Sequence, residues 1–329
     1  MKIGIFEISG WKREYLKKNL KRHKLIFINN ELNLNNLYKV KNVDGIVIFI
    51  YSNVNKEILN NLPKLKFIAT MSTGVDHIDI NFCRERKIMV FNVPSYGENT
   101  VAEHTFGLIL SLSKKIPQSV FRTKSDNFSL KGLEGFDLKN KVLGVVGVGN
   151  IGQHVIKIAN GFGMKVIANS KSVDKKLAKK LSFKFVSFDY LLKNSDIITL
   201  HLPLTAQTKH IINMDNIKLI KKGTYIINTA RGGLIDTKAL IYGLNNGIIS
   251  GAGLDVLENE DDLKEEAQML RDKFISTENM KTFLRNHRLL KEKNVIITPH
   301  SAFYTREAEI RILDTIISNI KSKKLNLTV

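Results

Sequence analysis

The 329-residue sequence has little cysteine, no long apolar run and a shortage of acidic side chains. Its single cysteine, Cys83, excludes an internal disulfide framework and favours a reducing compartment, so we expect a cytoplasmic protein. No apolar run reaches the roughly 18 residues that a membrane-spanning helix needs. The N-terminal stretch MKIGIFEISGWKRE is unlike a signal peptide, because Glu7 interrupts its short apolar part. We therefore expect a soluble chain that does not insert into membranes.

The shortage of acidic residues leaves a formal net charge of +20. A basic surface attracts phosphate, so one interpretation is nucleic-acid binding. The other is a composition rich in Lys, Ile and Asn, of the kind that an AT-rich genome produces. The basic residues are scattered along the chain and are not interleaved with stacking aromatic residues. This distribution favours the second interpretation, although it leaves a secondary role with nucleic acid open.

Short apolar runs at regular spacing indicate the fold of the first hundred residues. Five runs rich in β-branched residues begin 22, 21, 21 and 22 residues apart. Each interval fits a strand, a helix and two turns, which favours successive βα units and a parallel sheet. The five runs begin at Lys2, Lys24, Gly45, Lys66 and Ile88.

After Asn99 a long helical segment follows, which we expect to be capped by Asn99 or Thr100 with Glu103 in its first turn. A second series of apolar strands comes next, and an amphipathic stretch from Arg306 to about Ile320 ends the pattern. The simplest architecture is two doubly wound parallel-sheet α/β domains, Rossmann-like or flavodoxin-like, with an interdomain cleft. We expect residues 1–98 plus 301–329 to form a substrate domain. Residues 99–300 would form a dinucleotide-binding domain inserted into it, and the charged stretch 261–293 would form helices and loops.

A glycine-rich turn carries the first functional signal. The sequence GVGNIG, residues 147–152, follows the apolar strand VLGVV and opens a helical pattern. In this context Gly147 permits a tight turn, Gly149 lets the backbone approach a pyrophosphate, and Gly152 allows the helix to pack on the strand. The helix N-terminus then offers N–H groups to phosphates. The turn therefore predicts a dinucleotide site.

The acid that usually follows such a turn is absent. About twenty residues on, where an Asp or Glu would bind the adenosine ribose hydroxyls, the chain has Ser170, Lys171 and Ser172. Two hydroxyls and an ammonium group can hold a phosphate dianion. Our hypothesis is that NADP is accepted and preferred. The alternative is that Ser170 binds the ribose weakly and NAD is used.

Three later motifs place complementary side chains at strand ends. Arg231 follows the strand in INTARGGLID, Glu260 comes five residues after a strand end in GAGLDVLENE, and His300 ends the strand in IITPHSAFY. Arginine can clamp a carboxylate and polarise a carbonyl, and histidine can donate a proton to the developing alkoxide. A glutamate beside that histidine would favour the imidazolium. Together with a nicotinamide, this set predicts hydride transfer between a 2-oxo acid and a 2-hydroxy acid.

With these motifs the chain resembles the D-isomer-specific 2-hydroxyacid dehydrogenase family, in particular its D-lactate dehydrogenase-like branch. The resemblance extends over nearly the whole chain, through STGVDHID, NVPSYGENTVAEH, GVVGVGNIG, HLPLT, NTARGGLID, GLDVLENE and TPHSAFY. It implies that Arg231, Glu260 and His300 are the catalytic residues. It also implies D-stereospecificity and a homodimer, with the helix near Asn99 as an interdomain and dimer-forming element.

The resemblance assigns further residues to binding. The backbone of Thr73, Gly74 and Val75 would bind the substrate carboxylate, and Tyr96 would line the substrate pocket. The cofactor residues fall into three groups. They are Gly147, Gly149, Asn150, Ile151 and Gly152 at the pyrophosphate, Ser170, Lys171, Leu202, Pro203 and Thr208 at the adenosine side, and Thr229, Ala230 and Asp255 at the nicotinamide side.

The remaining histidines and the cysteine have simpler interpretations. His77, His104 and His154 lack partners at metal-ligand spacing, so we expect no metal site. His201 begins HLPLT at a strand end, which places it near the cofactor without a catalytic role. Cys83 lacks a nucleophile motif and is expected to be a packing residue.

We expect the substrate to be a small 2-oxo or 2-hydroxy acid, and Tyr96 and the AFY sequence after His300 favour a small uncharged side chain. Glyoxylate, hydroxypyruvate or phosphoglycerate chemistry is the nearest alternative. An NAD(H)-sensing, corepressor-like binding protein is the non-enzyme alternative, against which the intact set of Arg231, Glu260 and His300 argues.

Overall fold

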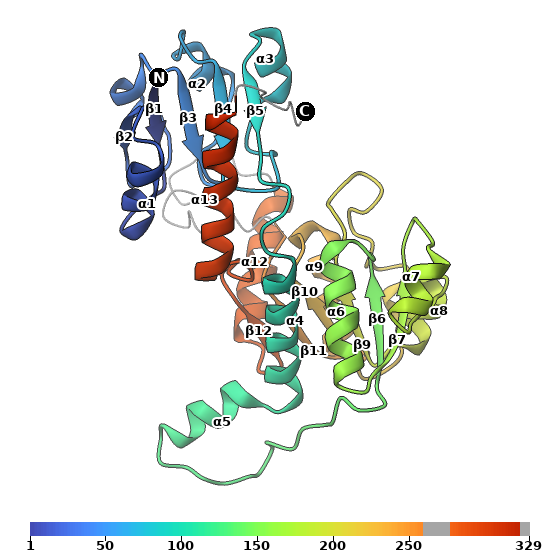
Figure 1. Cartoon of the computed structure of the whole chain (residues 1–329). Coiled ribbons are helices and arrows are strands. Elements are labelled where there is room, and N and C mark those ends of the chain that lie inside the picture. Colours follow the sequence, from blue (N-terminus) through green and yellow to red (C-terminus); the bar gives the residue numbers. More distant parts are fainter. Residues whose placement is uncertain (259–276, 323–329) are drawn as a thin grey trace. The chain divides into compact units, whose positions relative to one another are not determined.

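The computed structural model describes residues 1–258 and 277–322. The chain divides into two compact units (Figure 1). Unit 1 comprises residues 1–96 together with the chain from Thr305 onward, and unit 2 comprises Gly97–Tyr304. Each unit is an α/β domain built on one parallel sheet, which confirms the predicted fold class. No helix within the described ranges is long and apolar enough to span a membrane.

Unit 1 contains a five-stranded sheet in the order β2-β1-β3-β4-β5, in which every pair is parallel. All five strands lie within the predicted apolar runs. The strands are β1(Lys2–Ile5), β2(Lys24–Phe27), β3(Gly45–Ile48), β4(Phe67–Thr70) and β5(Met89–Phe91). The helices are α1(Trp11–Asn19), η1(Leu37–Val40), α2(Lys56–Asn60), α3(Ile80–Glu85) and α13(Arg306–Lys321).

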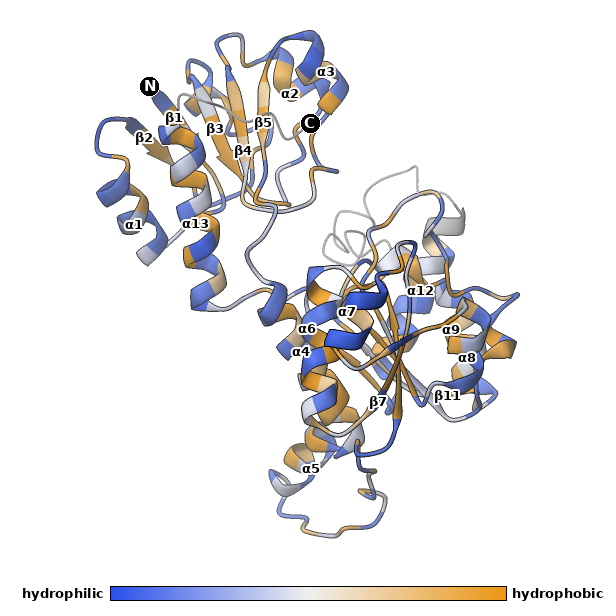
Figure 2. Ribbon diagram, turned by 45° about the vertical axis from the view of Figure 1, so that its right-hand side comes forward, coloured by the Kyte–Doolittle hydropathy of each residue, from blue (hydrophilic) through white to orange (hydrophobic). Residues whose placement is uncertain are grey.

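Helices cover both faces of this sheet, so its central strands are buried throughout (Figure 2). The last described helix, α13, begins at a Thr305 cap and packs beside α1. Lys12 pairs with Glu309, and the Arg306 guanidinium lies 3.6 Å from the centre of the Trp11 ring. Cys83 lies in the core, where burial raises the pKa of its thiol to about 11, in agreement with a packing residue.

Unit 2 contains a seven-stranded parallel sheet in the order β12-β11-β10-β9-β6-β7-β8. Its strands are β6(Val142–Val146), β7(Lys165–Asn169), β8(Lys184–Phe185), β9(Ile197–Leu200), β10(Thr224–Asn228), β11(Ile249–Leu254) and β12(Val295–Ile297). Its helices are α4(Glu98–Ser113), α5(Ile116–Thr123), α6(Asn150–Gly161), α7(Lys175–Lys180), α8(Phe188–Asn194), η2(Ile217–Leu219), η3(Gly232–Leu234), α9(Thr237–Asn245) and α12(Thr277–Lys291).

Alternate side chains of these strands enter two separate cores, because successive residues of a strand point to opposite faces. Ile227 packs with α4 and α6 in one core, whereas Ile226 packs with α8 and α9 in the other. This double burial explains why the strands are continuous apolar runs. Strand order reverses between β6 and β9, which is where doubly wound sheets bind ligands at their carboxyl ends.

Two local predictions, the cap of the long helix and the structure of the charged stretch 261–293, can be compared with the structure. The cap predicted for the long helix is wrong: α4 begins at Glu98 after Gly97, and no side chain caps it. Asn99 lies inside the first turn instead, and its amide donates to Glu103 Oε1 at 3.2 Å. In the charged stretch 261–293, the described part is mainly the helix α12, and residues 261–276 lie outside the described residues.

Candidate active site

The parallel sheet of unit 2 brings most of the expected site residues to one edge. Five adjacent strands, β12, β11, β10, β9 and β6, are followed within three residues by His300, Asp255, Arg231, Leu202 and the glycine turn, respectively. Residues far apart in the sequence thereby follow neighbouring strands at the same carboxyl edge. Ser170 follows β7, on the other side of β6.

The glycine turn has the backbone geometry that a dinucleotide needs. Gly147 has φ +98°, and a Cβ there would collide with the carbonyl of His201. A Cβ on Gly152 would collide with the carbonyl of Gly147. The helix can therefore pack this closely against the turn only because residue 152 has no side chain. At Gly149, by contrast, a Cβ would meet nothing within 4 Å, which leaves open space in front of the turn.

That open space faces the start of α6, a 12-residue helix whose N-cap Gly149 makes no side-chain cap bond. The first N–H groups of a helix lack helical acceptors and carry partial positive charge. Asn150 lies exposed at this end, and Ile151 packs against the core. The residues present therefore fit the pyrophosphate of a dinucleotide.

The end of β7 lies against the same turn, because the Gly147 N–H donates to the Asn169 carbonyl at 2.8 Å. Ser170, the next residue, is half-buried, and Lys171 is exposed. The nearby carboxylate, that of Asp174, accepts from the N–H groups of Lys176 and Leu177 as the N-cap of α7. The carboxylate of Asp174 is thus occupied in capping α7.

The loop after β9 forms the other wall. Leu202 reaches the glycine turn, since its Cδ2 lies 2.9 Å from the point where a Gly147 Cβ would be. The Thr208 hydroxyl donates to the Pro203 carbonyl at 2.6 Å and closes this loop on itself. The predicted adenosine-side residues Leu202, Pro203 and Thr208 therefore belong to one hydrogen-bonded loop.

His201, at the start of this loop, has a buried ring. Burial lowers the pKa of its imidazole to about 3, and its Nε2 lies 2.9 Å from the Thr199 hydroxyl. The ring is therefore neutral at physiological pH and cannot act there as a cationic proton donor.

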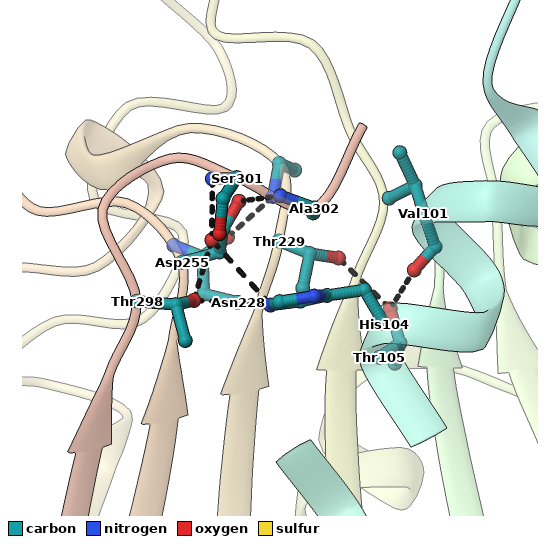
Figure 3. Close-up of polar contacts among 10 residues, drawn as sticks. Val101, His104, Thr105, Asn228, Thr229, Asp255, Thr298, Ser301 and Ala302 are labelled. Atoms are coloured by element: carbon teal, nitrogen blue, oxygen red, sulfur yellow. Dashed lines mark hydrogen bonds and ion pairs between the residues drawn. The ribbon is translucent and has the colours of Figure 1, made fainter. Parts of the chain in front are cut away.

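A buried carboxylate, that of Asp255, organises the chain around His300 (Figure 3). Its Oδ1 accepts from the Thr298 hydroxyl at 2.5 Å and from the Ser301 N–H at 2.9 Å. Its Oδ2 accepts from the Ala302 N–H at 2.8 Å. The loop that carries His300 is thus wrapped around the carboxylate.

The backbone of His300 is held in the same way. It has φ +53°, a conformation that costs a non-glycine residue energy. Its N–H donates to the carbonyls of Asp255 and Thr298, both at 2.9 Å. Hydrogen bonds to Asp255 from residues on both sides of His300 maintain this strained backbone conformation. They thereby fix the backbone position from which the imidazole side chain projects.

Helix α4 also contacts this network. His104 Nε2 lies 3.0 Å from the Thr298 hydroxyl and 3.5 Å from Asp255 Oδ1 (Figure 3). The hydroxyls of Thr105 and Thr229 lie 3.0 Å apart. These roles of His104 and Thr298 were not predicted from the sequence. The available signal was the position of His104 inside the NTVAEH motif.

Arg231 follows β10 on a turn that buried Asn228 organises. The Asn228 side chain donates to the Arg231 carbonyl at 2.9 Å and accepts from the Ala230 N–H at 3.1 Å. The Asn228 carbonyl also accepts from the Asp255 N–H at 2.9 Å. Asn228, another residue that the sequence analysis missed, therefore links the Arg231 turn to the Asp255 network.

Of the two acids in LENE, Glu260 lies outside the described residues. Glu258 is described, and its carboxylate is occupied: its Oε1 lies 2.5 Å from His210 Nε2, and its Oε2 accepts from Thr237. Both carboxylate oxygens of Glu258 thus already have partners within unit 2.

The expected carboxylate-binding residues lie in unit 1, after β4. The Thr73 hydroxyl donates to the Val93 carbonyl at 2.9 Å, and the Ser72 hydroxyl donates to the Gly74 carbonyl at 2.7 Å. The Val75 carbonyl accepts from the Ile78 N–H at 3.0 Å. These bonds hold the loop in one shape. Tyr96 is half-buried, and its carbonyl accepts from Arg311 Nε at 2.6 Å.

His77, another of the histidines, is engaged by a neighbouring hydroxyl. His77 Nε2 lies 3.0 Å from the Thr70 hydroxyl, and burial lowers the pKa of His77. No group of three or more His, Cys, Asp or Glu side chains that could hold a metal ion occurs among residues 1–258 and 277–322.

A glycine turn at the reversal of a parallel sheet, with an arginine and a histidine after two further strands of the same sheet, is typical of a nicotinamide-dependent dehydrogenase. Residues 106–302 match the model of the D-isomer specific 2-hydroxyacid dehydrogenase, NAD binding domain. The chain belongs to the D-isomer specific 2-hydroxyacid dehydrogenase family. It is thus a 2-hydroxyacid dehydrogenase that uses a nicotinamide cofactor.

Relatives in the family act on different acids. The chain is 39% identical to an aromatic 2-oxoacid reductase of Clostridium sporogenes, over 93% of this chain and 90% of the relative. It is 37% identical to a glyoxylate reductase of Thermococcus litoralis, over 86% and 81% of the two chains. A crystal structure of D-lactate dehydrogenase from Aquifex aeolicus, complexed with NAD and lactic acid, has a TM-score of 0.84. It is 35% identical and covers 97% of this chain and 94% of its own.

The substitution Asp255→Asn should destabilise the protein by about 3 kcal/mol, because a carboxamide cannot accept from every donor that surrounds the carboxylate. Urea denaturation measures this change. Asp236→Asn is the matched control. Asp236 caps α9, and asparagine caps as well as aspartate, so less than about 0.5 kcal/mol should be lost. Equal losses in the two variants would contradict the role assigned to Asp255.

His201 should make stability depend on pH. Its lowered pKa means that the unfolded state binds the proton more readily, so its contribution is complete above about pH 6.5. It is lost as pH falls toward about 3, by up to about 1.4 kcal/mol per pH unit. Urea denaturation of the wild type and His201→Gln between pH 6.5 and 4.5 measures the difference. Parallel stability curves for the two proteins would refute the assignment.

Proposed function

We propose that the protein is an NAD(P)H-dependent D-2-hydroxyacid dehydrogenase of the D-lactate dehydrogenase-like type, which reduces a small 2-oxo acid. The observation that carries this proposal is the arrangement at one sheet edge. There the glycine turn, the Arg231 turn and the His300 loop held by Asp255 follow strands of one parallel sheet.

In the proposed reaction, the glycine turn would hold the reduced nicotinamide cofactor, whose chemistry there would be the supply of a hydride to the carbonyl carbon. Arg231 binds the substrate carboxylate and polarises the carbonyl through its planar guanidinium. Protonated His300 donates its proton to the carbonyl oxygen, which becomes the hydroxyl. Glu260 would stabilise the imidazolium, and the neutral His201 does not compete as a proton donor.

The remaining expected residues complete the proposed site. Backbone N–H groups of Thr73, Gly74 and Val75 would bind the substrate carboxylate, and Tyr96 would line the pocket for its side chain. Thr229, Ala230 and Asp255 would lie at the nicotinamide side, where the Asp255 carboxylate acts by holding the His300 loop. The division into a substrate domain and a dinucleotide-binding domain belongs to the same proposal.

The cofactor preference follows from the end of β7. Ser170 and Lys171 adjoin the glycine turn through Asn169, and the neighbouring Asp174 is engaged in capping α7. An ammonium group there would attract a 2′-phosphate, whereas an acid would repel it. We therefore favour NADP over NAD.

A homodimer and a cytoplasmic location stay predictions. Support for the dimer comes from α5 and the loop after it, which expose large apolar side chains. Those of Phe121, Phe128 and Leu130 are each at least 77% exposed. Exposed apolar surface contributed by several large side chains is typical of interaction surfaces.

Replacing His300 or Arg231 tests the proposed chemistry. His300→Ala and Arg231→Ala should each lower kcat/KM by about 100-fold or more, because each loses a transition-state contact. Arg231→Lys should also be impaired, since lysine lacks the planar fork. The assay uses pyruvate, phenylpyruvate, glyoxylate and hydroxypyruvate, and it identifies the preferred substrate in the wild type. Turnover at the wild-type rate in either alanine variant would refute the assignment.

The cofactor preference is tested by comparing NADPH with NADH. The wild type should have the higher kcat/KM with NADPH. Ser170→Asp should move the ratio about tenfold toward NADH, because a carboxylate repels the 2′-phosphate and binds ribose hydroxyls. Lys193→Ala, which removes an exposed lysine on α8, is the control and should leave the ratio unchanged. A tenfold preference of the wild type for NADH would overturn the proposal.

A further inference from the structure

One ionisable pair at the carboxyl edge of unit 2 has no part in the proposed chemistry. His210 Nε2 lies 2.5 Å from Glu258 Oε1, and the Glu258 side chain is only 13% exposed. The other oxygen, Oε2, accepts from the hydroxyl of Thr237 at 2.9 Å and from its N–H at 3.2 Å. One carboxylate thus binds the side chain of His210 and the first residue of α9.

These contacts join the segments that carry the reaction groups. His210 lies on the loop that begins with Leu202, and its N–H donates to the Gly233 carbonyl at 2.8 Å. Gly233 belongs to the turn that follows Arg231. Glu258 lies just beyond β11, two residues before Glu260, and its carbonyl accepts from Asn286 Nδ2 on α12 at 2.7 Å.

The turn after Arg231 packs closely against the chain around Glu258. A Cβ on Gly232, directly after Arg231, would collide with the Leu257 carbonyl and the Glu258 N–H. A Cβ on Gly233 would lie 3.1 Å from Leu204. His210 itself has φ +52°, a conformation that surrounding contacts must maintain. A shift of Glu258 would therefore displace the turn that carries Arg231.

We infer that His210 and Glu258 are positioning residues, which together hold the Arg231 turn against the cofactor loop and against the chain leading to Glu260. They touch neither substrate nor cofactor and act through Arg231. This inference rests on the proposed function, because it assigns the pair to the reaction and not to folding alone.

Two substitutions separate the contact from its surroundings. Glu258→Gln keeps the size of the side chain, but one amide oxygen cannot accept from both His210 and Thr237. His210→Asn removes the contact because the side chain is too short, while asparagine tolerates a positive φ. The matched control is Lys221→Ala. It breaks a 2.7 Å pair with Asp196 at the opposite edge of the same sheet.

Steady-state kinetics gives the first readout. Glu258→Gln and His210→Asn should each lower kcat with the 2-oxo acid by about 10- to 100-fold, because Arg231 is misplaced. The KM for the reduced cofactor should change less than about threefold, and the double variant should be no worse than the poorer single one. Lys221→Ala should retain wild-type constants. Wild-type constants in both variants, or additive losses in the double variant, would overturn the inference.

Hydrogen–deuterium exchange gives a readout that needs no turnover. Amides of residues 231–237 should exchange faster in Glu258→Gln and His210→Asn than in the wild type or Lys221→Ala. Unchanged exchange there refutes the positioning role, even where melting temperatures fall. A wild-type enzyme that reduces no 2-oxo acid would refute the proposed function instead, and the exchange comparison would still decide whether the pair holds the turn.

Discussion

The buried carboxylate of Asp255 is the constraint on which the active-site edge depends. A charge removed from water is tolerated only when donors surround it, and here those donors come from Thr298, Ser301 and Ala302. Satisfying the carboxylate forces the loop to curl around it, and this curl places His300 at a positive φ. The electrostatic requirement of one side chain thus sets the position of another.

The same edge is held elsewhere by close backbone contacts. The glycine turn lies against the His201 carbonyl, and the turn after Arg231 lies against the Leu257 carbonyl, in both cases where a side chain could not fit. Asn228 joins the Arg231 turn to Asp255 through its side chain and its carbonyl. The edge is therefore a continuous set of loops that pack against one another and share hydrogen bonds.

Much of the fold could be predicted because its signals are local. Apolar β-branched runs at regular spacing located the five strands of unit 1, since strands buried on both faces need no polar alternation. The start of α4 was misplaced because no side chain caps it, so the sequence has no cap signal at Gly97. The network of His104, Thr298 and Asn228 was missed, because its members meet only when α4 packs against the sheet.

By itself the sequence determined the parallel α/β class, the glycine turn and the identity of the arginine and histidine at strand ends, because these depend on residue type and spacing. Tertiary structure decided which polar side chains hold these groups in place. The tertiary structure alone shows that the His300 loop encloses Asp255. It also shows that Glu258 contacts His210, a contact that the sequence could not assign because Glu258 and Glu260 are the same residue type. The physical reason is that hydrogen-bond partners are selected by distance in space, which spacing along the chain does not encode.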